Sequence, residues 1–217
     1  MDDVERVSSA LQRLKLFPLP QAVLFPGALL PLHIFEPRYR QMVHEALATD
    51  SVIAMARPLR DTTGEPTPLE PTVCAGVITT HEKLEDGRYN LVLQGVMRAR
   101  IVQELPTRKQ FREVEARGLP DAPYQGRLVI HVRQAVLALA PLLPEAAGEW
   151  VHQVASAKEG GELADLVATA VVNDERRRGQ LLDETRVPER LELVLEDIGG
   201  LLARLGAQAG GSGGLKN

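Results

Sequence analysis

The sequence predicts an α+β fold in which a small β-barrel is followed by a bundle of helices. Up to about residue 120, apolar residues alternate in short runs, and beyond it they recur with the 3.6-residue period of a helix. The first part also contains six or so strand-like runs separated by tight bends, which is typical of a closed or partly open barrel. We therefore predict a barrel subdomain over 13–120, a helical subdomain over 121–207 and a flexible glycine-rich tail over 208–217.

The beginning of the predicted barrel is unusually rich in proline. Residues 1–12 form a brief leading helix or are frayed, and the stretches from Leu14 to Leu19 and from Val23 to Phe35 are predicted as strands. Proline cannot donate to a sheet ladder, so we expect short edge strands joined by fixed bends. The prolines that interrupt the apolar runs are Pro18, Pro20, Pro26, Pro31 and Pro37.

One helix is expected inside this strand-rich half. Pro37 suits the first turn of a helix, and the apolar residues after it lie at positions i, i+3, i+4, i+7 and i+8, which form a single face. These residues are Tyr39, Met42, Val43, Ala46 and Leu47.

The remaining strands follow this helix. Val52 to Ala56 is predicted as a buried strand, Arg57 to Pro71 as a proline-rich loop, and Phe111 to Arg117 as the last strand. Between them, Thr72 to Lys83 is expected to pair with Arg88 to Glu104 around the hairpin signal Asp86-Gly87.

A two-residue turn in that hairpin would place Leu91 opposite Glu82. We therefore predict a bulge or a longer loop between Thr79 and Gly87.

Three helical stripes follow residue 120. The last of them begins at Pro188 and contains Gly199 and Gly200, each costing up to about 1 kcal/mol relative to alanine, so we expect a kink there. The basic run at residues 176–178 is expected to be a solvated face beyond a helix end. The stripes are Leu128, Val132, Ala135, Val136 and Leu139; Leu163, Leu166, Val167, Ala170 and Val171; and Leu191, Val194, Leu195, Ile198, Leu201, Leu202 and Leu205.

Composition narrows the class of protein. Hydrophobic residues make up 44% of the 217 residues, which supports a buried core. No apolar run reaches 18 residues, and the acidic start is unlike a signal peptide, so we expect a cytoplasmic protein that does not bind a membrane. The net charge of −4 and the aromatic content of 4% argue against nucleic-acid binding.

No catalytic or metal-binding motif is visible. The chain has no G-x-x-x-x-G-K-[ST] sequence, and its five histidines form no H-x-x-x-H pair, so we predict no catalytic residues, no metal and no cofactor. The single cysteine, Cys74, lies between apolar neighbours and is interpreted as a core thiol. His33 is expected to be a rim residue that bonds a backbone carbonyl. A hydrolytic site that joins a histidine to Cys74 or to a carboxylate remains an alternative.

Phe35, Arg38 and Tyr39 are the first candidates for a binding surface. They lie beside the proline that starts the predicted helix, where Arg38 and Tyr39 could line a groove for a peptide carboxylate or backbone. A structural interpretation is also open, in which Glu36 caps the helix or pairs with an arginine while Tyr39 buries its ring and bonds its hydroxyl.

Arg98 and Arg100 are the second candidates. They share a strand face with Val96 and Val102. They could anchor an acidic ligand, or their stems could simply cover apolar surface.

Several segments, in the order of the chain from about residue 14 to 205, resemble the N-terminal substrate-recognition domain of Lon-type ATP-dependent proteases. The resemblance is strongest to the free-standing bacterial versions and to the related domain of cereblon. The segments are Phe17-Pro18-Leu19, Leu24-Phe25-Pro26-Gly27, Pro31-Leu32, Ile34-Phe35-Glu36-Pro37-Arg38-Tyr39, Gly76-Val77-Ile78, Asp86-Gly87-Arg88-Tyr89, Gln94-Gly95-Val96-Met97-Arg98-Ala99-Arg100-Ile101, Gly161-Glu162-Leu163-Ala164-Asp165-Leu166-Val167-Ala168, Gln180-Leu181-Leu182 and Pro188-Glu189-Arg190-Leu191.

The resemblance implies a PUA-like barrel with a helical bundle, and a module that binds unfolded or exposed protein segments. The ATPase and Ser/Lys peptidase activities of the family are not carried over, because the sequence lacks the phosphate-binding motif and leaves no room for a protease half. A separate ATPase or protease stays open as a partner, as does the oligomeric state. The alternatives are a PUA-like RNA-binding protein and a small hydrolase.

Overall fold

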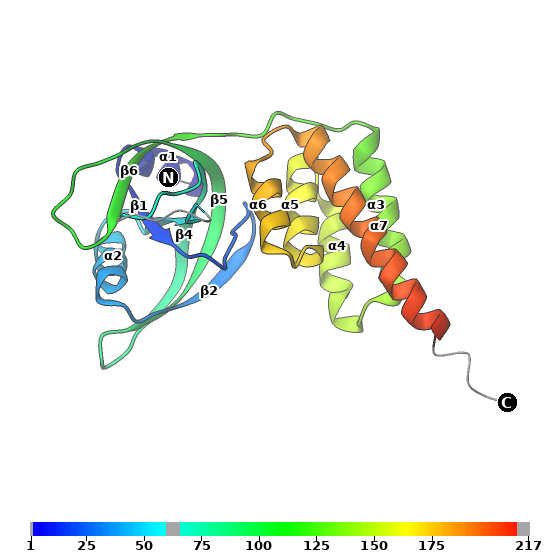
Figure 1. The fold of residues 1–217 in the computed structure, drawn as a ribbon, viewed down its shortest axis with the longest axis horizontal. Coiled ribbons are helices and arrows are strands. Elements are labelled where there is room, and N and C mark those ends of the chain that lie inside the picture. The colour runs from blue at the N-terminus through cyan, green and yellow to red at the C-terminus, as the bar shows by residue number, and fades with distance from the viewer. Residues whose placement is uncertain (1, 60–65, 212–217) are drawn as a thin grey trace. The chain divides into compact units, whose positions relative to one another are not determined.

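The computed structural model describes residues 2–59 and 66–211, with side chains described up to residue 207. The fold is mixed α+β, and the chain divides into two compact units, Met1–Pro120 and Asp121–Asn217. The first, the strand unit, contains all the strands of the described residues, and the second, the helical unit, is helical (Figure 1). Part of the predicted loop over Arg57 to Pro71, and residues 212–217 of the predicted tail, lie outside the described residues.

The first unit begins with a helix, so of the two alternatives for residues 1–12 the leading helix is the one observed. Asp2 and Glu5 form a capping box at its start: the Asp2 side chain accepts from the Glu5 N–H, and the Glu5 side chain accepts from the Asp2 N–H. The elements of the unit are α1 (Asp3–Ala10), η1 (Leu11–Arg13), β1 (Leu14–Pro18), β2 (Leu29–Ile34), α2 (Pro37–Ala48), β3 (Val52–Ala56), β4 (Thr72–Lys83), β5 (Tyr89–Glu104) and β6 (Arg112–Gly118).

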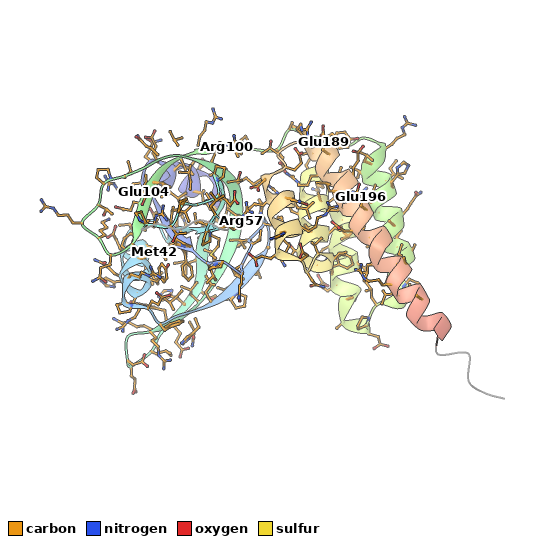
Figure 2. All side chains as sticks on the ribbon, in the orientation of Figure 1. Met42, Arg57, Arg100, Glu104, Glu189 and Glu196 are labelled. Carbon is orange, nitrogen blue, oxygen red and sulfur yellow. The ribbon has the colours of Figure 1, made fainter. Side chains whose placement is uncertain are left out.

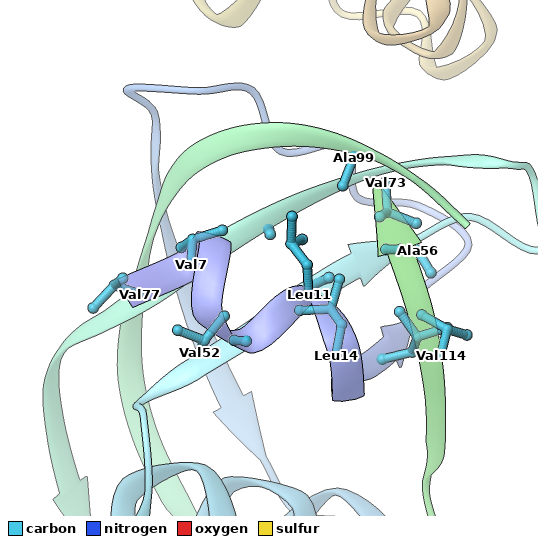
Figure 3. Packing of buried hydrophobic residues seen from close by; sticks show 14 residues of the cluster. Val7, Leu11, Leu14, Val52, Ala56, Val73, Val77, Ala99 and Val114 are labelled. Carbon is cyan, nitrogen blue, oxygen red and sulfur yellow. The ribbon is translucent and has the colours of Figure 1, made fainter. Parts of the chain in front are cut away.

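The strands form one six-stranded sheet in the order β2-β5-β4-β3-β1-β6. Because β6 also pairs with β5, the ladder returns to β5 and closes a ring of five strands, with β2 attached outside the ring. Of the six pairs of neighbouring strands in this sheet, the β1–β3 pair is parallel and the other five are antiparallel. A cluster of aliphatic side chains from α1, η1 and the ring strands forms the core, with Val7 and Leu11 from the N-terminal elements and Leu14, Val52 and Val114 from the strands (Figure 3).

The inserted helix α2 is confirmed. Pro37 is at its N-terminus, and Tyr39, Met42, Val43 and Ala46 are buried as the spacing predicted. Met42, labelled in Figure 2, has no exposed surface.

The expected strand from Val23 to Phe35 is wrong in its first half, because β2 begins only at Leu29. Phe25 to Ala28 form a β-turn instead: the Ala28 N–H donates to the Phe25 carbonyl at 3.1 Å. Pro26 occupies the second position of the turn, and Gly27 the third with a φ of 80°, which is the arrangement of a type II turn. The apolar residues Val23, Leu24 and Phe25 are buried without being in a strand.

The prediction of a bulge or a longer loop in the β4–β5 hairpin is confirmed, and the structure has both. The strands are joined by a loop between Lys83 and Tyr89, and the register skips Thr79. A further shift, which the sequence did not predict, lies between Ala75 and Gly76, where Val96 on β5 is the extra residue.

Strand β2 has a free outer edge in the described structure. The Gly95 N–H donates to the Ala28 carbonyl, and antiparallel pairing alternates, so the backbone groups of Leu29, Pro31 and His33 point away from β5. Pro31 therefore removes one donor from this outer edge.

The second unit consists of α3 (Arg127–Leu139), η2 (Ala140–Leu142), η3 (Glu145–Ala147), α4 (Gly148–Ser156), α5 (Gly160–Val171), α6 (Glu175–Asp183) and α7 (Val187–Gly211). Helix α7 contacts α3 and α5, and Leu191, Val194 and Ile198 of its predicted stripe are buried. It continues through Gly199 and Gly200 without a break. The helix also extends beyond residue 207, where a flexible tail was predicted to begin.

The basic run Arg176–Arg178 was misplaced by the sequence analysis. It lies in the first turns of α6, where Asp174 caps the helix by accepting from the Arg177 N–H. Arg177 pairs with Glu196 and Asp197 of α7. The run therefore joins two helices, because its neighbouring carboxylate starts a helix rather than following one.

Arg190 on α7 is fully buried and is the centre of an ion cluster. Its Nη2 donates to Asp121, its Nε lies 3.4 Å from Asp165 Oδ1, and its Nη1 donates to the Glu184 carbonyl. A Cβ on Gly161 would lie 2.9 Å from the guanidinium, so the glycine leaves space for this cluster.

Candidate functional site

Two of the sequence segments that resemble the Lon family contact each other in the structure: the one at residues 24–27 and the one that contains Gly95 and Arg98. The turn at Phe25–Ala28 lies against β5 at Gly95: the Gly27 N–H donates to the Gly95 carbonyl at 2.8 Å, and the Gly95 N–H donates to the Ala28 carbonyl at 2.9 Å. Arg98, three residues further on, places its guanidinium carbon 6.0 Å from the centre of the Phe25 ring. The glycine and the arginine therefore hold the proline-rich segment onto the sheet.

This position makes Arg98 a buried residue, with 2% of its surface exposed. Arg100, two residues along β5, is exposed and lies opposite Thr72 and Arg117; Figure 2 labels it on the strand unit. The structure thus does not bring Arg98 and Arg100 together with Phe35, Arg38 and Tyr39.

Arg38 and Tyr39 do lie together, at a pocket of about 250 Å³. The Arg38 guanidinium carbon lies 4.5 Å from the centre of the Tyr39 ring. The Tyr39 ring also contacts Phe17, with a centroid distance of 4.5 Å, and its hydroxyl donates to the Pro18 carbonyl at 3.4 Å. The pocket is lined by Pro18, Pro20, Arg38, Tyr39, Pro58, Pro66, Thr67, Leu69 and Arg112.

Each arginine of this pocket is held by a carboxylate. Arg38 donates through Nε and Nη2 to Glu36 at 2.9 and 2.8 Å. Arg112 makes a two-pronged pair with Glu104 at 2.8 and 2.6 Å, and its Nη1 donates to the Thr67 carbonyl. The expected pairing of Glu36 with an arginine and the expected burial of Tyr39 are therefore confirmed, while Glu36 does not cap α2 with its side chain.

Burial of the ring raises the pKa of the Tyr39 phenol above 10.0; Arg38 and Arg112 oppose this effect and Glu36 adds to it. We expect Tyr39 to ionise at a higher pH than an exposed tyrosine. The stability gained by keeping the phenol neutral is then fully present below pH 10.0 and is lost as the pH rises through the folded-state pKa.

The measurement is the phenolate absorbance of the folded protein during an alkaline titration, compared with Tyr39→Phe. The difference isolates one of the three tyrosines. A Tyr39 that ionises together with an exposed tyrosine would contradict the raised pKa.

Phe35 lies on a different surface, formed by β2, β5 and β4. It is 60% exposed, and its ring stacks on that of His33 with a centroid distance of 6.2 Å. A groove of about 570 Å³ runs across the three strands. Its lining residues are Pro31, Leu32, His33, Thr80, His81, Glu82, Asn90, Leu91 and Val92.

His33 bonds side chains rather than the expected backbone carbonyl. Its Nδ1 lies 2.7 Å from Asn90 Oδ1, and its Nε2 lies 3.3 Å from Arg88 Nη1. An arginine can only donate, so Nε2 accepts and Nδ1 carries the hydrogen. Glu82 accepts from Asn90 Nδ2, and in the described part of the chain no histidine pairs with a carboxylate in this groove.

Cys74 is fully buried, which confirms its interpretation as a core thiol. A buried thiol in an apolar strand is not placed to attack a substrate. Among the described residues, no group of three or more His, Cys, Asp or Glu side chains could hold a metal ion. None of the described helices combines the length and the apolar character that a membrane crossing requires.

The sequence analysis did not identify four of the residues that line the pocket. They are Pro58, Pro66, Leu69 and Arg112. Arg112 reaches the pocket because β6 pairs with β1, which places Arg112 opposite Leu16. A barrel prediction that does not include the strand order cannot place Arg112 beside Arg38 and Tyr39.

The fold is that of a class of isolated N-terminal domains from ATP-dependent proteases. The N-terminal domain of the Mycobacterium avium complex Lon protease matches with a TM-score of 0.71 and 20% identity, covering 86% of this chain and 98% of that chain. The Lon N-terminal domain protein from Xanthomonas campestris matches with a TM-score of 0.61 and 22% identity, covering 85% and 97%. At these identities the likeness establishes the fold.

The family model described as the ATP-dependent protease La (LON) substrate-binding domain matches residues 13–198. The chain belongs to this family, which confirms the resemblance stated from its motifs.

Curated relatives are longer proteins. The Lon protease of Anaeromyxobacter dehalogenans is 30% identical over 192 residues, which is 84% of this chain and 22% of the relative. Lon protease 2 of Myxococcus xanthus is 29% identical over 202 residues, or 85% and 23%. The chain therefore spans less than a third of the length of these relatives.

Proposed function

We propose that this chain is a non-catalytic module that binds unfolded or exposed segments of other proteins. The observation that carries the proposal is the match of residues 13–198 to a substrate-binding domain. An ATPase or protease would act on the bound segments, because residues 1–217 contain no phosphate-binding loop. The burial of Cys74 supports the non-enzymatic assignment.

The proposed scaffold is a PUA-like barrel followed by a helical bundle. The ring of β5, β4, β3, β1 and β6 closes through the β5–β6 pairing, which is the connectivity that a small barrel needs. Strand β2 adds to this ring and leaves one edge open.

The proposed contact surface is this open edge of β2 and the apolar side chains beside it. Leu29 at its start is 63% exposed, and Phe35 just beyond its end is 60% exposed. The outward backbone groups of Leu29 and His33 are free to pair with an extended chain. Backbone pairing of this kind gives affinity without strict sequence choice, which suits a protein that must bind many different unfolded segments.

The test is binding of a permanently unfolded model protein, with its folded form as the control ligand. We expect the unfolded form to bind and the folded form not to bind. In the double variant Leu29→Ser, Phe35→Ser we expect affinity to fall by about tenfold or more, because exposed aromatic and aliphatic anchors contribute much of such interfaces. The readout is fluorescence anisotropy of the labelled ligand.

Val102→Ser is the matched control, since Val102 is also an apolar residue of the strand unit and is 58% exposed. It should bind like the wild type. Equal binding of the folded and unfolded ligands, or hydrolysis of ATP or peptide by the pure protein, would contradict the proposed function.

A further inference from the structure

We propose that the pocket in front of Tyr39, between Arg38 and Arg112, binds a carboxylate group of the captured polypeptide. The inference rests on the proposed function and adds a second, ionic contact to it. The pocket is separate from the β2 edge, because the two sets of lining residues have no member in common.

The charge of the pocket wall favours an anion. Of the described residues that line it, two carry guanidinium groups and none carries a carboxylate. Glu36 and Glu104, which hold these arginines, are not among the lining residues. Figure 2 labels Glu104 on the strand unit. The carboxylates therefore orient the two cations from outside the pocket, and the remaining donors are left for a ligand.

Arg38 has N–H donors that its pair with Glu36 does not use. Its Nε and one Nη2 hydrogen are used by Glu36, and among the described residues its Nη1 has no hydrogen-bond partner. Its guanidinium carbon lies 4.5 Å from the centre of the Tyr39 ring, and this cation–π contact together with the Glu36 pair orients the group before a ligand arrives. A planar group held in this way loses little side-chain entropy when it binds a carboxylate.

Tyr39 and Arg112 complete the site. The Tyr39 hydroxyl has only a long bond of 3.4 Å to the Pro18 carbonyl, so a ligand oxygen can replace that acceptor. Arg112 is held at all three nitrogens, and each of its terminal nitrogens has a second hydrogen. Four of the lining residues are prolines, whose own φ angles are fixed.

A carboxylate of a polypeptide comes either from its free C-terminus or from an Asp or Glu side chain. Both present two oxygens to a guanidinium in the same geometry. The experiment therefore uses three labelled peptides of the same apolar sequence: one with a free C-terminal carboxylate, one with a C-terminal amide, and one with a C-terminal amide and an internal aspartate. Binding is measured by fluorescence anisotropy.

We expect at least one carboxylate peptide to bind about tenfold more tightly than the plain amide, because its hydrogen bonds to the guanidinium groups are charge-assisted. Whichever of the two carboxylate peptides has the advantage identifies the source. Arg38→Gln should abolish the advantage and leave the affinity for the plain amide unchanged. The Arg38 side chain is 53% exposed, so this substitution leaves the fold intact.

Arg40→Gln is the matched control. Arg40 is on the same helix but lines a different hollow with Gln41 and His44, so this variant should keep the advantage. Equal affinity of the wild type for all three peptides overturns the inference. If the plain amide and the unfolded model protein still bind, the proposed function stands without it; if nothing binds, the proposed function fails as well.

Discussion

Replacing Gly95 with alanine will destabilise the strand unit by about 2–4 kcal/mol, the sum expected for overfilling a close contact and weakening two hydrogen bonds. A Cβ at this position would lie 2.9 Å from the carbonyl carbon of Phe25 and closer still to its oxygen. These are backbone atoms, which cannot relieve the contact by changing rotamer as a side chain can. To make room, the Phe25–Ala28 turn must move off β5 and lose its bonds to Gly95.

Gly118→Ala is the control for Gly95→Ala. It adds the same methyl group to a strand of the same unit, but the nearest obstacle is the sulfur of Met97 at 3.0 Å, the mobile end of a side chain. We expect a loss of less than about 1 kcal/mol. Stability is measured by urea unfolding followed by far-UV circular dichroism, and hydrogen exchange of the β5 amides locates the change. A Gly95→Ala protein as stable as Gly118→Ala would refute the close approach of the turn.

Replacing Arg190 with methionine will cost the helical unit about 3–5 kcal/mol, the usual effect of removing one partner of a buried ion pair. Methionine fills a similar volume without a charge. The carboxylates of Asp121 and Asp165 then lose the cation that they share, and the Glu184 carbonyl loses a donor. The loss thus comes from uncompensated polar groups rather than from an empty space.

The only tryptophan of the chain, Trp150, provides the measurement for Arg190→Met. It joins α4 to α5 through a bond from its Nε1 to the Leu166 carbonyl at 3.2 Å, so its fluorescence reports unfolding of the helical unit. Arg186→Met is the control: Arg186 is 67% exposed, and water screens its pairs with Glu184 and Glu189, so this substitution should leave the unfolding midpoint nearly unchanged. A wild-type midpoint for Arg190→Met would show that the cluster is not closed in solution.

Periodicity predicted the elements that have a single apolar face. The positions of α2 and of the α7 stripe followed from a 3.6-residue spacing, since one side of each helix is buried. The same reasoning failed at Val23 to Ala28, where the apolar residues are buried in a turn. Burial alone does not distinguish a strand from a loop that lies against a sheet, and here only the Pro26-Gly27 pair carried that information.

The candidate site was predictable only where its parts are adjacent in the chain. Arg38 and Tyr39 lie side by side on a helix that the sequence predicted, so their neighbourhood was foreseen. Arg112 joins them only because β6 pairs with β1, and the orienting role of Glu104 depends on a second pairing, that of β6 with β5. Such neighbours are set by strand order, which a single sequence leaves open.

The missing donor at Pro31 also has a consequence for edge-to-edge pairing of two β2 strands. If two β2 edges paired, neither strand would have an N–H donor at Pro31, near the centre of the new ladder. The hydrogen bonds that a continuous intermolecular sheet needs would therefore be missing there. A solitary guest strand can bypass the gap by pairing at its two ends, whereas fibril growth requires every rung. If the proposed capture at β2 occurs, Pro31 is thus compatible with a single bound strand and unfavourable for a sheet shared between copies.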